Sequence, residues 1–239
     1  MWAICKKELR QFFSSLTGYI AIIVFLLLNG LFLFVFPDSN LFDAGYATLD
    51  TFFEIAPWVF LLLIPAITMR SFSEEFKGGT FEILQTKPLT KTQVILGKYF
   101  ASLLIVLVAI LPTLIYVFTI DKLSTGGIDA GGIAGSYIGL FLLAAVFTAI
   151  GICCSSFTTN AVVAFLLSAF ACFTVFSAFS AISRIPFFQS GADYYIGMLG
   201  LDEHYKSISR GVLDSRDLVY FLTAVLFFLF LTARNLVKR

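Results

Sequence analysis

IAGSYIGLFLLAAVFTAIGICC, residues 133–154, contains no charged side chain. A helix rises about 1.5 Å per residue, so this stretch can cross the roughly 30 Å hydrocarbon core of a bilayer. Further apolar runs occupy residues 19–36, 52–69, 99–120, 161–182 and 218–233. Apolar residues make up 59% of the chain and charged residues only 13%, far from a soluble average. The predicted fold is all-α, a single polytopic membrane domain of residues 1–239 with six transmembrane helices.

The charges predict the orientation of these spans. Lys and Arg near span ends tend to remain in the cytoplasm. With the N-terminus inside, the inner segments hold eleven basic and four acidic residues, and the outer segments hold five basic and eleven acidic residues. The net charge of +1 therefore divides into about +7 inside and about −6 outside. We predict that both termini are cytoplasmic and that the first apolar run is a retained span.

A separate pattern precedes the first span, within residues 1–17. Between residues 2 and 16, apolar side chains recur at helical spacing on one face, and basic and polar side chains lie opposite. The apolar face consists of Cys5, Leu9, Phe12, Phe13 and Leu16. We interpret the segment as an interfacial amphipathic helix with its basic face toward anionic lipid. The alternative is a simple basic anchor.

The inner loop 70–98 has the signals of ordered structure. Gly78-Gly79 predicts a break, and Thr80 is placed to cap a short helix over 81–85 with Glu82 in its first turn. Pro88 forbids a continuation, and the capping-box pattern at Thr90 starts a helix that runs through Gly97-Lys98 into the third span. The loop is therefore predicted to be a helical module below the membrane.

Large apolar side chains are frequent in this module. They are Phe72, Phe76, Phe81, Ile83 and Leu84. We expect them to be exposed, and they are too many for a loop that faces only water. They either lie on the membrane surface or bind another protein, and we favour the second interpretation.

The outer segments differ from one another. Residues 121–132 are Gly-rich and indicate a flexible connector, and residues 37–51 form a short polar link. Residues 183–217 are longer and partly aromatic, which favours a segment that dips into the interface or caps the bundle. Asp214 is expected to cap the last helix.

Signals of catalysis or metal binding are weak. His204 is the only histidine and is interpreted as a surface residue. Cys5, Cys153, Cys154 and Cys172 fall within spans or on the inner side, so no disulfide is expected. No phosphate-binding Gly-rich loop with Lys-Ser or Lys-Thr occurs, and no lysine lies inside a predicted span. Glu54 is the one ionisable residue within a span and is expected to reach the headgroups.

These features resemble a known family. The basic first helix, the six spans and the stretch from Arg70 through Glu74-Glu-Phe-Lys-Gly-Gly-Thr-Phe-Glu-Ile-Leu-Gln-Thr-Lys-Pro-Leu-Thr to Gly97-Lys98 look like the type-2 ABC exporter permeases. The outer segment from His204 to Tyr220 is similar to gliding-motility-associated permeases of Bacteroidetes-type bacteria.

The resemblance implies a non-catalytic permease subunit of the inner membrane, which pairs with a second permease and with a separate ATP-binding subunit that holds the ATP. It places the coupling helix at Thr80–Gln85. The implied contacts with the ATP-binding subunit are Glu74, Glu75, Thr80, Phe81, Glu82, Leu84 and Gln85. A second inner contact is implied at Ser155, Ser156, Thr158 and Asn160.

Other functions stay open at this point. The chain is compatible with a membrane scaffold or anchor of an envelope or motility complex, through which nothing crosses. It is also compatible with a permease that serves another export system. A secondary transporter that works alone is disfavoured, because the spans lack a relay of ionisable groups.

Overall fold

The computed structural model describes residues 1–36, 48–85, 89–124, 127–185, 192–211 and 214–237. These residues form helices and connecting turns, without a strand among them. The longer helices are α1 (Trp2–Phe13), α2 (Leu16–Phe34), α3 (Asp50–Thr68), α6 (Lys91–Ile110), α7 (Leu114–Leu123), α8 (Ala130–Phe157), α9 (Ala161–Phe173) and α13 (Ser215–Val237). The shorter ones are α4 (Arg70–Lys77), α5 (Thr80–Gln85), η1 (Leu111–Thr113), η2 (Thr174–Ala178), α10 (Phe179–Ser183), α11 (Ala192–Gly197) and α12 (Leu201–Ser209). The all-α prediction is confirmed.

Several of these helices join into segments that are long and apolar enough to cross a membrane. Within the described residues there are five, namely Asp50–Lys77, Lys91–Leu123, Ala130–Phe157, Ala161–Ser183 and Ser215–Val237. α1 and α2 pass the same test together, across a bend of 72°. The chain thus has five or six candidate spans, and each predicted apolar run overlaps one of them.

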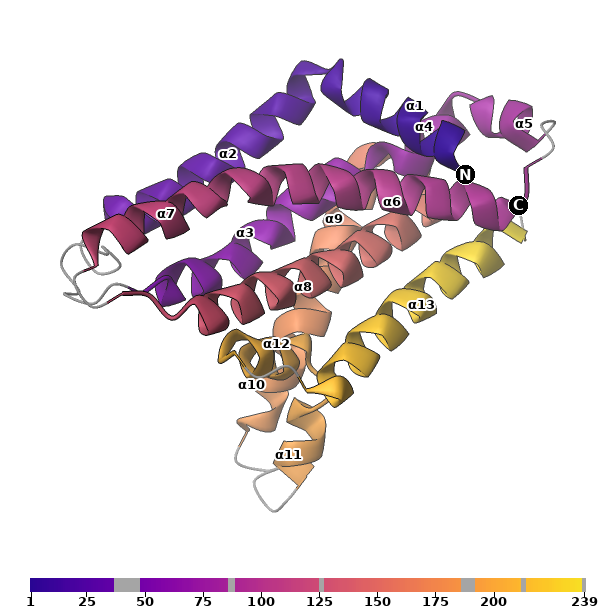
Figure 1. Cartoon of the computed structure of the whole chain (residues 1–239). Helices are drawn as coiled ribbons and strands as arrows, with labels where there is room; N and C mark the ends of the chain where they lie inside the picture. Colours follow the sequence, from indigo (N-terminus) through magenta and orange to yellow (C-terminus); the bar gives the residue numbers. More distant parts are fainter. Residues whose placement is uncertain (37–47, 86–88, 125–126, 186–191, 212–213, 238–239) are drawn as a thin grey trace.

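Figure 1 shows the N- and C-termini at the same end of the bundle, close to α1, α4 and α5. We call this the terminal end. The opposite side carries the far ends of α2 and α7, and α10 to α12 gather below α8. A common location of the termini is what an even number of crossings produces.

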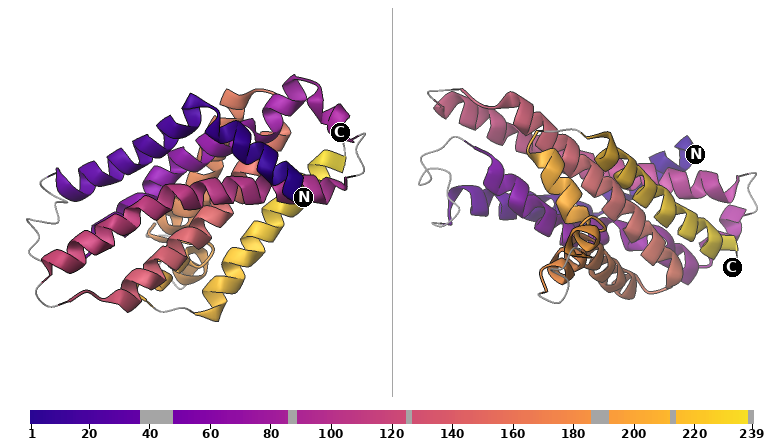
Figure 2. Two further views of the ribbon diagram at one scale, coloured as in Figure 1. Left: turned by 45° about the horizontal axis from the view of Figure 1, so that its top comes forward. Right: turned by 90° about the horizontal axis from the view of Figure 1, so that it is seen from below.

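α8 is the central helix of the bundle. Of its most apolar window, 78% is buried, against 17% for α13, which lies beside it (Figure 2). Small residues permit close contacts along α8, as is usual where membrane helices pack. A Cβ atom on Gly151 would lie 2.0 Å from Thr68 Oγ1, so only glycine allows α3 to approach there.

The last outer segment is folded rather than extended. α12 packs against α8 and α13, with Leu201, Tyr205 and Ile208 buried. Asp214 accepts a hydrogen bond from Arg216 N at 2.9 Å and caps α13, as predicted. The Gly-rich connector 121–132 is shorter than predicted, because α7 extends to Leu123 and α8 begins at Ala130 after its cap Asp129. Residues 37–47 of the polar link lie outside the described part of the chain.

The prediction that His204 is a surface residue is wrong. Its side chain is only 10% exposed, Nδ1 lies 2.6 Å from Asp217 Oδ1, and Nε2 lies 2.9 Å from the Met198 carbonyl oxygen. The ring also stacks on Tyr220 at a centroid distance of 4.0 Å. These contacts tie α12 to α13, because the buried carboxylate of Asp217 requires a polar partner.

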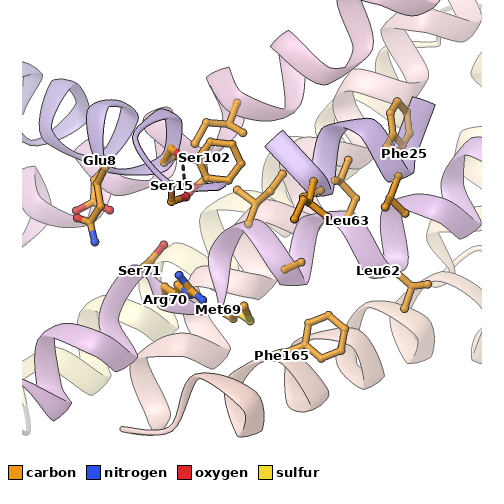
Figure 3. Close-up of a pocket in the computed structure, with 18 of the residues that line it drawn as sticks. Glu8, Ser15, Phe25, Leu62, Leu63, Met69, Arg70, Ser71, Ser102 and Phe165 are labelled. Atoms are coloured by element: carbon orange, nitrogen blue, oxygen red, sulfur yellow. Dashed lines mark hydrogen bonds between the residues drawn. The ribbon is translucent and has the colours of Figure 1, made fainter. Parts of the chain in front are cut away.

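α1 packs against the other helices of the bundle. Its apolar face packs on α6, where Ile4 and Cys5 are buried and a Cβ on Gly97 would lie 3.0 Å from Ile4 Cβ. The helix ends at Phe13, and Ser15 accepts a hydrogen bond from Gly18 N to cap α2. Leu16 therefore starts α2 and is 76% exposed, unlike the other members of the predicted face. Between α2, α3 and α6 lies a cavity of about 690 Å³ (Figure 3).

Candidate functional site

The terminal end carries a helical hairpin formed by α4 and α5. Gly78 and Gly79 separate the two helices, and Gly79 has φ +64°, a left-handed conformation that glycine adopts without strain. The predicted break is therefore confirmed. Thr80 Oγ1 donates a hydrogen bond to the Glu75 carbonyl oxygen at 3.4 Å, which fastens the start of α5 to α4.

Three phenylalanine rings hold the hairpin closed. Phe81 lies 5.0 Å from Phe76 and 6.3 Å from Phe72, measured between ring centroids. The expectation that these rings are exposed is wrong for Phe72 and Phe81, which are 0% and 7% exposed. The rings bury one another because the glycine turn folds α5 back onto α4.

The rings belong to a larger cluster, which we call the terminal cluster. It contains the buried residues Ile4, Phe72, Phe81, Val94, Ile95, Tyr99, Ala149, Ile152 and Leu236. These come from α1, α4, α5, α6, α8 and α13. The cluster therefore packs α5 together with helices of several candidate spans.

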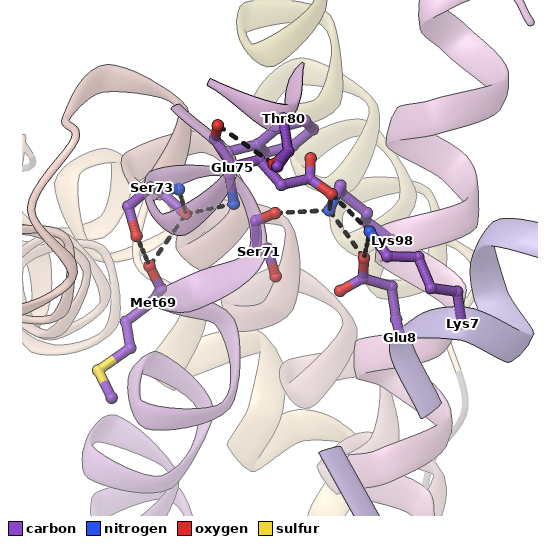
Figure 4. Close-up of polar contacts among 10 residues, drawn as sticks. Lys7, Glu8, Met69, Ser71, Ser73, Glu75, Thr80 and Lys98 are labelled. Atoms are coloured by element: carbon purple, nitrogen blue, oxygen red, sulfur yellow. Dashed lines mark hydrogen bonds and ion pairs between the residues drawn. The ribbon is translucent and has the colours of Figure 1, made fainter. Parts of the chain in front are cut away.

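Four charged side chains lie beside the terminal cluster (Figure 4). Lys98 Nζ is 2.8 Å from Glu8 Oε1 and 3.0 Å from Glu75 Oε1, and Lys7 Nζ is 2.9 Å from the same Glu75 oxygen. We call Lys7, Glu8, Glu75 and Lys98 the ionic cluster. It connects α1, α4 and α6 with two positive and two negative charges.

Lys98 is the most buried member, with 1% of its side chain exposed. Its ammonium also donates to the Ser71 carbonyl oxygen and lies 5.1 Å from the centre of the Phe72 ring. A buried charge is costly unless it is paired and hydrogen-bonded, and these partners satisfy Lys98. Lys98 belongs to the same continuous helical segment as the third apolar run, which begins at Lys91.

Lys7 is the exposed edge of the ionic cluster. Burial alone would lower the pKa of Lys7, but its hydrogen bond to Glu75 and the charges of Glu75 and Glu8 outweigh this and raise the pKa. The ammonium therefore keeps its charge at neutral pH, and α1 remains paired to α4.

A hydroxyl group of α8 caps the start of α4. Ser155 Oγ accepts hydrogen bonds from Phe72 N at 2.9 Å and Ser73 N at 3.2 Å, and donates to the Met69 carbonyl oxygen at 3.1 Å. The first N–H groups of a helix lack partners within the helix, so a side chain from elsewhere satisfies them here. The position of α4 thus depends on α8.

Comparison with protein families decides what kind of protein this is. Residues 2–209 match the ABC-2 family transporter proteins. The chain belongs to this family. A comparison with curated proteins gave no match. ABC-2 permeases are typically non-catalytic membrane subunits that pair with ATP-binding subunits.

The residues predicted to contact the ATP-binding subunit divide by burial. Glu74, Thr80 and Glu82 are exposed at the surface of the permease. Glu75 and Phe81 are buried in the ionic and terminal clusters, and Leu84 is partly buried. The side chains of Gln85 and Ile83, and the turn expected at Pro88, lie outside the described part of the chain.

The predicted second contact divides in the same way. Ser155 is buried as the cap of α4, and Ser156 is buried and bound by Asn235 Nδ2 at 3.0 Å, which joins α8 to α13. Thr158 is partly buried. Asn160 is exposed and caps α9 by accepting from Val162 N at 2.9 Å.

Sequence reasoning did not find the ionic cluster of this permease. The charge pattern places Lys7, Glu8 and Lys98 on the inner side but predicts no partner for any of them. One signal was available, since Lys98 follows Gly97 directly at the start of an apolar run, where an unpaired charge is unfavourable. The thiols of all four cysteines are free, and no group of three or more His, Cys, Asp or Glu residues suited to a metal occurs among the described residues.

Proposed function

We propose that this chain is the permease subunit of an ABC exporter, and that a separate ATP-binding subunit drives it by pressing on α5. The observation that supports this proposal most directly is the burial of Phe81 in the terminal cluster, because Phe81 joins the surface hairpin to that cluster. A displacement of α5 would move Phe72 of α4. It would also move α8, because Ser155 of α8 is hydrogen-bonded to the start of α4. Export across the inner membrane of a bacterium follows as the proposed activity.

The surface available for that contact consists of Glu74, Thr80 and Glu82, with Asn160 at the loop between α8 and α9. In this proposal the remaining predicted residues are buried beneath the contact surface and hold its helices in position. Glu75 and Phe81 hold the hairpin, and Ser155 and Ser156 hold the ends of α4 and α13. A second permease protomer completes the complex.

The terminal end is assigned to the cytoplasm. Eleven of the sixteen Lys and Arg residues fall in the inner segments under this orientation, and ATP is available only on that side. The common location of both termini supports the even number of crossings on which the assignment rests.

A role in gliding motility remains a finer proposal. It rests on the resemblance of the segment from His204 to Tyr220, most of which lies beyond the family match at residues 2–209.

The test is co-purification of the tagged full-length chain from its native membranes, followed by measurement of ATPase activity. We expect an ATP-binding subunit to accompany the wild type, and Glu82→Arg to abolish its retention. Glu203→Arg is the matched control, because Glu203 is an exposed glutamate of α12 away from the terminal end. Retention of the subunit by Glu82→Arg would refute α5 as the contact. A stable set of envelope proteins without an ATPase would favour the scaffold.

A further inference from the structure

The cavity between α2 and α3 lies beside the ionic cluster and shares Glu8 with it (Figure 3). Its volume of about 690 Å³ falls in the range of pockets that hold small molecules. α6 contributes Ser102 and α9 contributes Phe165, while the end of α1 and the start of α4 surround one end. We call that end, lined by Glu8, Ser15, Arg70 and Ser71, the mouth.

The lining changes from polar to apolar with distance from the mouth. Beyond the mouth, α2 presents Val24 and Leu28, and α3 presents Leu62 and Ala66. From Ser15 to Leu28 the helix rises about 20 Å, compared with about 15 Å for the hydrocarbon region of one leaflet. A molecule that fills this cavity must be amphipathic, with an apolar chain about one leaflet long.

The mouth offers one charge of each sign. Arg70 contributes a guanidinium whose Nε pairs with Glu74 Oε1 at 3.2 Å, and a guanidinium carries four further N–H donors. Glu8 contributes a carboxylate, one oxygen of which lies 2.8 Å from Lys98 Nζ. Guanidinium groups bind phosphate oxygens well, and carboxylates accept hydrogen bonds from amines.

We propose that this cavity binds one phospholipid of the adjacent leaflet, with a zwitterionic headgroup. Its phosphate contacts Arg70, its amine contacts Glu8, and one acyl chain lies between α2 and α3. Charge complementarity selects this occupant over a helix of a second copy, which would cover the apolar walls but bring no phosphate and amine to the mouth. Since Glu8 belongs to the ionic cluster, a bound lipid also fastens α1 to the bundle.

The test uses the full-length chain in vesicles of equal parts phosphatidylethanolamine and phosphatidylglycerol. After extraction in mild detergent, native mass spectrometry counts the lipids that stay bound. We expect one retained phosphatidylethanolamine per protomer, enriched roughly tenfold over phosphatidylglycerol. Arg70→Gln should lower this retention roughly tenfold, because it removes the charged donor without changing the packing.

Two matched controls separate the causes. Glu74→Gln breaks the same ion pair but leaves the guanidinium, and should retain the lipid. Ala66→Phe fills the apolar part and should expel the lipid, whereas Val219→Phe, at a position of α13 that is 62% exposed, should not. Equal retention of both lipids, or unchanged retention by Arg70→Gln, would overturn the proposal. Disulfide cross-linking of Val24→Cys between two copies would also overturn it, since a second copy would then occupy the groove.

Discussion

Lys98 and Glu8 lie 90 positions apart in the chain, and yet their Nζ and Oε1 atoms approach to 2.8 Å in a site where the lysine is 1% exposed. The pair joins the first helix to the third span. Glu75 of α4 binds the same ammonium, so three helices meet at one charge.

Removal of Lys98 is therefore expected to be severe. Lys98→Ala leaves Glu8 and Glu75 with only Lys7, and should lower the free energy of unfolding by about 3–5 kcal/mol. Lys206→Ala is the control, because Lys206 forms an exposed pair with Asp202 that should contribute less than about 1 kcal/mol. Thermal unfolding in detergent measures both. Equal losses would show that the ionic cluster contributes no more than a surface pair.

The close contact between α3 and α8 depends on Gly151, which has no side chain. Gly151→Ala would place a Cβ 2.0 Å from Thr68 Oγ1 and should destabilise the fold by about 1–3 kcal/mol. Gly30→Ala should be nearly neutral, because its nearest neighbour would be Tyr116 Oη at 3.6 Å. Adding Thr68→Ala to Gly151→Ala should recover part of the loss. Failure of this rescue in thermal unfolding would place the cause elsewhere.

Phe81 and Glu82 are neighbours with different expected effects. Phe81→Ala removes a ring that is 7% exposed and should release α5 from α4, with faster proteolysis in the hairpin and loss of transport-linked ATPase activity. Glu82→Ala should weaken binding of the ATP-binding subunit while proteolysis of the free permease stays unchanged. Limited proteolysis with and without the subunit distinguishes them, and identical digestion patterns for the two variants would contradict the assignment.

His204 should be a structural residue at the far side of the bundle. His204→Ala leaves the buried carboxylate of Asp217 without its partner and should cost about 1–3 kcal/mol of stability. Glu203→Ala, at the exposed neighbouring position in α12, should change stability little. The comparison is made by thermal unfolding, and a neutral His204→Ala would mean that the Asp217 contact adds no stability.

The helices could be predicted because their signals are local. Residues 133–154 contain no charge, and the capping box at Thr90 is present as expected, with Gln93 N donating to Thr90 Oγ1 at 3.2 Å. The turn at Gly78-Gly79 follows from the chemistry of glycine alone. Each of these signals lies within one short stretch of sequence.

The contacts of the candidate site could not be predicted in the same way. The burial of Phe81 depends on the direction in which the hairpin folds, and that of Ser155 depends on α4 lying above α8. The surface interpretation of His204 rests on its being the only histidine in the sequence, whereas its burial depends on Asp217, thirteen residues away. Pairings between distant side chains depend on tertiary packing, which periodicity and composition do not encode.

The ionic and terminal clusters have a consequence for biogenesis. A chain is synthesised from its N-terminus, so Glu8 leaves the ribosome long before Lys98, and Leu236 follows last. Glu8 of α1 therefore lacks its partner Lys98 while the first spans insert, and the terminal cluster is complete only after α13 has been synthesised. Nascent chains stalled before α13 should therefore expose the apolar face of α5 to quality-control proteases, so that completion of synthesis itself acts as the checkpoint for assembly.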